Sequence, residues 1–146
     1  MSGQKIKIDV VLGQGMSLMA KGDSNHWVPM DASTEMGGFS AATRPIELFL
    51  MGVVGCTSMD VILILKKKRV AYTDLKVEAT TEREDEHPKV FKYVNIHFKV
   101  YGTDLKEKAI ARAIELSSEK YCAASAMLKK SLPVTTSYEI IEPTQK

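Results

Sequence analysis

The sequence feature that most constrains the fold is an apolar segment of twenty residues, IELFLMGVVGCTSMDVILIL, which spans residues 46–65. Its length and composition satisfy the requirement for a membrane-spanning helix. It also contains two carboxylates, Glu47 and Asp60, which would be costly in hydrocarbon, and the chain has no second apolar segment to shelter them. We therefore expect no membrane association, and instead a helix that is apolar nearly all round and buried on most sides.

The residues that flank this segment indicate where the helix begins and ends. Pro45 suits the first helical turn, and the basic run 66–69 suits the last turn, where cations complement the helix dipole. A helix from residue 45 to 69 would be about 37 Å long, whereas a compact domain of 146 residues is about 38 Å across. Since one chain of this size can hardly cover such a helix, we expect a second copy of the chain to cover its exposed side in a homodimer.

Alternating apolar and polar residues predict strands on both sides of the helix. The clearest pattern is Val94, Ile96, Phe98 and Val100, which alternate strictly over the longest expected strand. Strands are expected near residues 6–10, 16–20, 26–30, 75–79, 94–100 and 134–141, with a loop over 31–43. The order β-β-β-α-β-β-α-β predicts an α+β fold in which antiparallel sheets pack on the long central helix.

A second helix is expected between the last two strands. Asp104 can cap it, and apolar residues over 109–117 form a stripe on one side. The helical pattern weakens at Ser117-Ser118 and resumes from Cys122 onward. This break would place Cys122 near a helix N-terminus, where the helix dipole favours a thiolate.

Composition narrows the class of protein. The chain has 20 Lys and Arg against 18 Asp and Glu, a net charge of +2, which argues against a nucleic-acid-binding protein. Two cysteines are too few for a disulfide-rich secreted miniprotein, and the N-terminal residues lack the apolar core of a signal peptide. We therefore expect a single cytoplasmic domain, residues 1–146, whose cysteines start as thiols.

Cys56 and Cys122 are the residues best suited to chemistry, and two interpretations of them are open at this point. Free cysteines are often buried simply as small apolar side chains. Alternatively, if the second helix packs on the first, the two sulfur atoms approach each other and can form a redox pair.

Both cysteines lie in segments that resemble a known family. RPIELFLMGVVGCTSMD, residues 44–60, resembles the first helix motif of the OsmC/Ohr superfamily of hydroperoxide-detoxifying proteins, and SEKYCAASA, residues 118–126, is similar to the segment that carries its second cysteine. The expected strand order and the chain length match as well. The resemblance implies an OsmC-like fold, an intertwined homodimer with active sites at the subunit interface, and a thiol peroxidase that uses no metal, haem or other cofactor.

The resemblance also implies roles for individual residues. Cys56 would be the peroxidatic thiol and Cys122 the resolving thiol of a sulfenate and disulfide cycle, which an unidentified dithiol reductant would reset. The best-studied members carry a catalytic glutamate directly after the motif proline, where this chain has Ile46 and places its glutamate at Glu47. They also carry a catalytic arginine nearer the N-terminus, whereas the first arginine here is Arg44.

Helix geometry limits what Glu47 and Arg44 can do. On an ideal helix they lie about 13.5 Å and about 18 Å along the axis from Cys56, so neither can activate it from the same helix. Both could do so from a partner subunit whose helix crosses antiparallel. The alternative is that they form an ordinary first helical turn.

Three further features bear on the reactivity of Cys56. Asp60 follows it at i+4 on the same helix face, where a carboxylate raises the pKa of a thiol. Alternatively, Asp60 pairs with a lysine such as Lys67 or marks a polar pocket. Gly52 and Gly55 are unfavourable within a helix by about 1 kcal/mol each, so a partner backbone, a substrate or a packed helix is expected close to them.

The histidines, His26, His87 and His97, have no short-spaced partner and do not resemble zinc ligands.

From the resemblance and the two cysteine motifs, the chain is predicted to be a cytoplasmic, homodimeric thiol peroxidase that reduces hydroperoxides, organic ones above all, through Cys56 and Cys122. Two alternatives stay open: a non-catalytic module that binds a small ligand, and a redox sensor.

Overall fold

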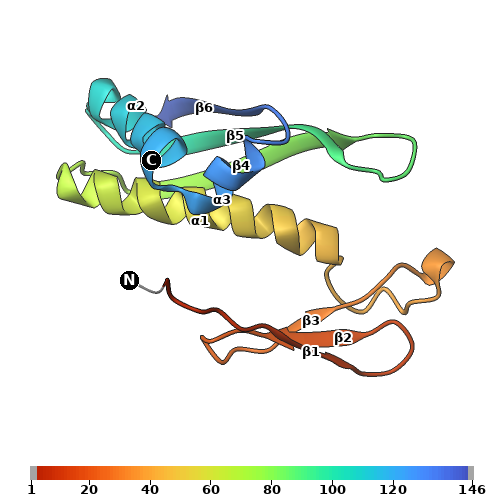
Figure 1. Ribbon diagram of the computed structural model, residues 1–146. Helices are drawn as coiled ribbons and strands as arrows, with labels where there is room; N and C mark the ends of the chain where they lie inside the picture. Colours follow the sequence, from red (N-terminus) through yellow and green to blue (C-terminus); the bar gives the residue numbers. More distant parts are fainter. Residues whose placement is uncertain (1–2, 145–146) are drawn as a thin grey trace. The chain divides into compact units, whose positions relative to one another are not determined.

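The computed structural model describes residues 3–144, which form two compact units, the first ending at Met51 and the second beginning at Gly52. Together they contain two three-stranded sheets and a long helix, which confirms the predicted α+β class and the order of its main elements (Figure 1). That helix, α1, runs over Pro45–Lys67. It begins at the predicted proline and ends two residues before the predicted residue 69.

The first unit is built around an antiparallel sheet of strands β1 (Asp9–Leu12), β2 (Leu18–Lys21) and β3 (Val28–Met30). The first strand begins at Asp9, later than the predicted start near residue 6, because β2 ends at Lys21, whose partner is Asp9. Ile6 and Ile8 therefore lie beyond the pairing and are exposed.

The loop that follows β3 is ordered by one buried carboxylate. Asp31 is 2% exposed and accepts hydrogen bonds from the backbone amides of Ala32, Phe39 and Ala41 at 2.8–3.1 Å. The Ala41 amide is the strongest of the influences that lower the pKa of Asp31, and together the three amides outweigh its burial. A short 3-10 turn, η1 (Thr34–Met36), lies inside this loop.

The sheet of the second unit comprises β4 (Asp74–Arg83), β5 (Phe91–Tyr101) and β6 (Val134–Ile141). β4 and β5 pair antiparallel, but β5 and β6 pair parallel. The prediction of purely antiparallel sheets is therefore wrong for this pair. The reason is the helical crossover between β5 and β6, which returns the chain to the end of the sheet from which β5 started.

The crossover contains three short helical segments: α2 (Glu107–Leu116), the π-helical turn η2 (Ser117–Tyr121) and α3 (Ala123–Leu128). The predicted break at Ser117-Ser118 is confirmed as this π-helical turn. The predicted cap Asp104 is wrong, because Asp104 has φ 51° in the preceding turn and Lys106 occupies the N-cap position of α2.

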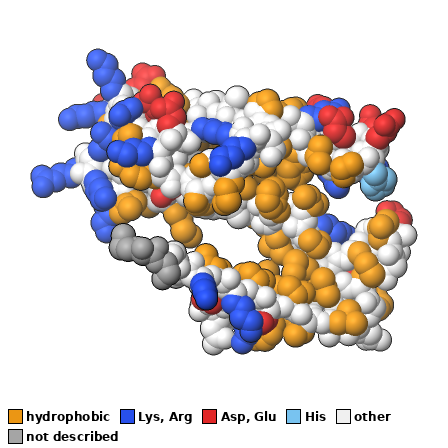
Figure 2. All heavy atoms as spheres, in the orientation of Figure 1, with side chains coloured by type: hydrophobic (Ala, Val, Ile, Leu, Met, Phe, Trp, Pro, Cys, Tyr) orange, Lys and Arg blue, Asp and Glu red, His pale blue; other side chains and the backbone are white. Residues whose placement is uncertain are grey.

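The core of the second unit lies between α1 and the sheet. Val53, Thr57, Val61 and Leu65, spaced four residues apart on α1, are at most 3% exposed. Val94, Ile96, Phe98 and Val100 of β5 are fully buried, as their alternation predicts. α1 has the length and hydropathy of a membrane span. Only 22% of its most apolar stretch of 18 residues is buried. Figure 2 shows apolar side chains exposed along it.

Candidate active site

Both cysteines and one carboxylate meet inside the second unit. The Sγ atoms of Cys56 and Cys122 and a carboxylate oxygen of Asp60 all lie within 4.8 Å of one another. Cys56 and Asp60 lie one turn apart on α1, and Cys122 lies where the π-helical turn η2 meets α3. Of the two interpretations left open by the sequence, the structure therefore agrees with the one in which the two sulfurs approach each other.

Cys122 is the N-cap residue of α3, 2% exposed, and its sulfur accepts hydrogen bonds where a side-chain oxygen usually would. The Ser125 amide donates to Sγ at 3.4 Å, and the Thr57 hydroxyl lies 3.2 Å from Sγ. Burial alone would raise the pKa of Cys122. The Thr57 hydroxyl, the Ser125 amide and the Cys56 thiol outweigh that effect, so its pKa is lowered.

Cys56 is half-buried, and its pKa is shifted in the opposite direction. The Ala124 amide, the largest influence, lowers the pKa of Cys56. Burial, the neighbouring Cys122 sulfur and the Asp60 carboxylate together raise it by more. The two thiol pKa values are therefore shifted in opposite directions, that of Cys122 downward and that of Cys56 upward.

The hydroxyl groups around Cys122 form a short relay. Thr57 is fully buried, and its Oγ1 lies 3.0 Å from the Val53 carbonyl and 3.1 Å from Ser125 Oγ. Because a hydroxyl has one proton, Thr57 donates either to the Val53 carbonyl or to a Cys122 thiolate, and in both cases it can accept a hydrogen bond from Ser125. Sequence analysis did not select Thr57 and Ser125. Their positions in the sequence, directly after Cys56 and three residues after Cys122, could have indicated them.

Asp60 has no partner for one of its oxygens. Its Oδ2 is buried and accepts no hydrogen bond from any residue over 3–144. The alternative in which Asp60 pairs with Lys67 has no ion pair to support it among these residues. Asp60 instead lines a cavity of about 380 Å³. The walls of this cavity comprise Asp60, Leu63, Ile64, Lys67, Lys68, Leu116 and Tyr121.

Arg44 and Glu47 make their contacts within the first unit. The Glu47 carboxylate accepts a hydrogen bond from the Arg44 amide at 3.2 Å, which is the reach-back contact of a helix N-terminus. The Arg44 guanidinium donates to the Ala42 carbonyl at 2.8 Å and to Ser40 Oγ at 3.0 Å. These contacts explain the pair as a first helical turn, and their catalytic roles stay predictions.

The glycines of α1 face open space. A Cβ atom added to Gly52 or Gly55 would meet no atom within 4 Å, apart from the backbone of the helix itself, in the part of the chain that is described. Packing within the described part of the second unit therefore does not account for either glycine.

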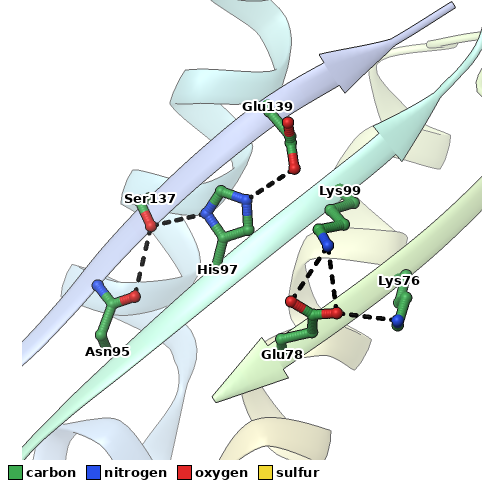
Figure 3. Close-up of polar contacts among 7 residues, drawn as sticks. All are labelled: Lys76, Glu78, Asn95, His97, Lys99, Ser137 and Glu139. Atoms are coloured by element: carbon green, nitrogen blue, oxygen red, sulfur yellow. Dashed lines mark hydrogen bonds and ion pairs between the residues drawn. The ribbon is translucent and has the colours of Figure 1, made fainter. Parts of the chain in front are cut away.

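A separate polar cluster lies on the more exposed face of β5. Its β5 residues alternate with the buried core residues of that strand, so the cluster faces away from the core. His97 contacts Ser137 Oγ at 2.8 Å and Glu139 at 3.2 Å on the neighbouring strand β6 (Figure 3). On the other side, Glu78 contacts Lys76 and Lys99, and both lysines lower its pKa, Lys76 more strongly. The contacts of His97 and Lys99 join adjacent strands, and they account for His97 as a strand residue.

Comparison with known proteins reveals a clear relationship. The family model of OsmC-like proteins matches residues 37–137. The chain is 40% identical over 128 residues to the protein YhfA of Escherichia coli, a match that covers 88% of this chain and 92% of the relative. A solved OsmC-like protein from Mycoplasma pneumoniae superposes with a TM-score of 0.80 at 18% identity, over 96% of this chain and 99% of the other. A Legionella pneumophila protein, described as an organic hydroperoxide resistance protein OsmC, gives 0.70 at 17% identity, over 95% and 99% of the two chains.

Proposed function

Because the chain belongs to the OsmC-like protein family, we propose that it is a thiol-dependent peroxidase that reduces hydroperoxides through Cys56 and Cys122. The observation that carries the proposal is the approach of the two sulfurs to within 4.8 Å, since the pair is close enough to join as a disulfide after a small movement. We place the reaction in the cytoplasm, where thiols are kept reduced.

In the proposed first step, Cys56 is the attacking thiol because it is the more accessible of the two. Its proton passes to the neighbouring Cys122 thiolate, which leaves Cys56 as the nucleophile. The Cys56 thiolate then attacks the terminal oxygen of the peroxide and the O–O bond breaks, which oxidises Cys56 to a sulfenic acid and releases an alkoxide. Cys122 returns the proton to the alkoxide, so that an alcohol leaves and Cys122 is again a thiolate.

In the second step, the Cys122 thiolate attacks the sulfenic sulfur. A disulfide forms, the S–O bond breaks, and hydroxide leaves and takes a proton from solvent to become water. The hydrogen bond from the Ser125 amide supports this role, because it stabilises Cys122 as the thiolate that the step requires. The Thr57 hydroxyl, 3.2 Å from the same sulfur, can donate to the thiolate in place of the Val53 carbonyl. A dithiol reductant then donates two electrons to reopen the disulfide.

Organic hydroperoxides are the proposed substrate class. The cavity beside Asp60 has apolar walls from Leu63, Ile64 and Leu116, which suit the organic group of such a peroxide. The description of the Legionella pneumophila protein as an organic hydroperoxide resistance protein is consistent with this choice.

We also propose a homodimer in which α1 of one subunit packs against the other. Met59, Ile62 and Leu63 on α1 are 73%, 39% and 50% exposed, and the open space at Gly52 and Gly55 would allow a close approach of a second backbone. In such a dimer, Arg44 of one subunit could supply a cation to the Cys56 site of the other subunit, and Glu47 a carboxylate in addition to that of Asp60.

One observation favours a second candidate function. The raised pKa of Cys56 reduces its thiolate fraction at neutral pH, which suits a slow redox sensor or a non-catalytic ligand-binding module better than a fast peroxidase. The rate of the first step separates these candidates.

The experiment treats the reduced protein with one equivalent of cumene hydroperoxide and follows its intact mass. The wild type should lose about 2 Da within minutes as the disulfide forms, and Cys122→Ser should gain about 16 Da as a trapped sulfenic acid. Cys56→Ser should form neither product. An unchanged wild-type mass after minutes would reject the peroxidase and leave the sensor or binding module.

A further inference from the structure

The proposed peroxidase cycle gives Asp60 no role, yet the structure places its carboxylate against both sulfurs. One of its oxygens is buried without a hydrogen-bond partner, which is a costly arrangement for a polar atom. A bound cation would supply the missing partner. The ligand atoms gathered here, two thiol sulfurs and one carboxylate oxygen, are those that a zinc ion accepts.

We propose that Cys56, Cys122 and Asp60 of the reduced protein form a Zn²⁺ site with three protein ligands and one open position. In a tetrahedral site with ordinary zinc–ligand bond lengths, the ligand atoms lie about 3.5–3.8 Å apart. The three atoms here all lie within 4.8 Å of one another, so side-chain movements of about 1 Å or less complete the geometry.

The groups around the three ligands fit a metal-bound state. The Ser125 amide and the Thr57 hydroxyl contact the Cys122 sulfur, and the Ala124 amide contacts the Cys56 sulfur, as donors around zinc thiolates do. Two thiolates, one carboxylate and Zn²⁺ together carry one negative charge. Lys67 and Lys68, which line the same cavity as Asp60, offset that charge. A water would fill the fourth position.

Zinc binding would occupy the two thiols that peroxide oxidises. Each thiol that still carries a proton releases it to solvent on coordination, and no electrons are transferred. The ion is therefore an inhibitor of disulfide formation, not a cofactor of the reaction. The site itself is independent of the proposed function, because it requires only that both thiols be reduced.

The test measures the affinity of the reduced full chain for Zn²⁺ by competition with a chromophoric chelator. The variant Asp60→Asn keeps the shape of the side chain but removes the charge, and we expect it to weaken binding at least about tenfold. The matched control Asp85→Asn, in an exposed loop, should bind as the wild type does. Equal affinity of wild type and Asp60→Asn would overturn the proposal.

A second measurement needs no variant. Co²⁺ added to the reduced wild type should give the thiolate-to-cobalt charge-transfer band and the intense visible bands of a four-coordinate site with two thiolates. A spectrum without the charge-transfer band would overturn the proposal. Peroxide oxidation of the metal-free protein is assayed separately, so failure to bind zinc and failure to reduce peroxide are distinguished.

Discussion

Replacing Gly52 and Gly55 by alanine tests how α1 is covered. Both glycines lie inside a helix, and a Cβ atom added at either would meet no atom within 4 Å in the described part of the chain beyond the helix's own backbone. Without a partner, the two alanines should therefore raise the free energy of unfolding. With a partner helix packed at these positions, they should lower it.

For a chain that stays single, each change replaces a poor helix residue with the best one and meets no clash. The gain is about 1 kcal/mol per site, or about 2 kcal/mol for the double variant. In the proposed dimer, the same methyl groups enter the space through which the partner helix approaches, and overpacking costs about 1–3 kcal/mol per site. We therefore expect the double variant to dissociate to monomers at concentrations where the wild type is dimeric.

The assay combines sedimentation equilibrium with urea unfolding at two protein concentrations tenfold apart. The wild-type midpoint should rise with concentration and that of the double variant should not. The control Lys108→Ala, at an exposed position on α2, should behave as the wild type does. If both glycine variants are about 1 kcal/mol more stable at every concentration, with an unchanged mass, the argument for a partner helix at these positions is wrong.

Three further predictions concern single side chains. Thr57→Val, made in a Cys56→Ser background, should raise the pKa of Cys122 because it removes a hydroxyl donor, and thiolate absorbance against pH should shift upward. Asp60→Asn should lower the pKa of Cys56 and speed the loss of free thiol with cumene hydroperoxide at pH 7; a slower reaction would contradict the electrostatic argument. Asp31 has a lowered pKa in the folded state, so its contribution to stability is complete above the ordinary value of 3.8 and is lost as the pH falls toward the folded-state pKa. Unfolding of Asp31→Asn should accordingly depend less on pH below 5 than that of the wild type, as followed by circular dichroism.

Much of the fold could be predicted from local patterns. The strict alternation from Val94 to Val100 identifies β5 because every second residue enters the core, and Pro45 marks the start of α1 because proline suits the first helical turn. Asp104 was wrong as a helix cap because its sequence suits both a cap and a turn, and the chain uses it in the turn. The parallel pairing of β5 with β6 depends on how the crossover returns the chain, which strand patterns do not encode.

Of the candidate site, the sequence indicated the two cysteines and Asp60 but not the hydroxyl groups around them. Cys56 and Cys122 stand out because thiols are rare in this chain, whereas Thr57 and Ser125 are common residue types whose importance arises from contact. The directions of the two pKa shifts agree with the sequence argument from Asp60 and the helix N-terminus, but the individual hydroxyl and amide donors could not be identified from the sequence. Which sulfur these donors face is a property of the packed helices.

The π-helical turn at Ser117–Tyr121 has a consequence for how this family member can vary. A π turn holds one more residue than an α-helical turn, so it rotates everything that follows relative to α2. Cys122 is the first residue after the turn, and deleting one residue from it would turn the sulfur away from Cys56 by about 100°. Lineages that keep the dithiol can therefore substitute exposed residues of this turn, such as Lys120, more easily than they can change its length by one.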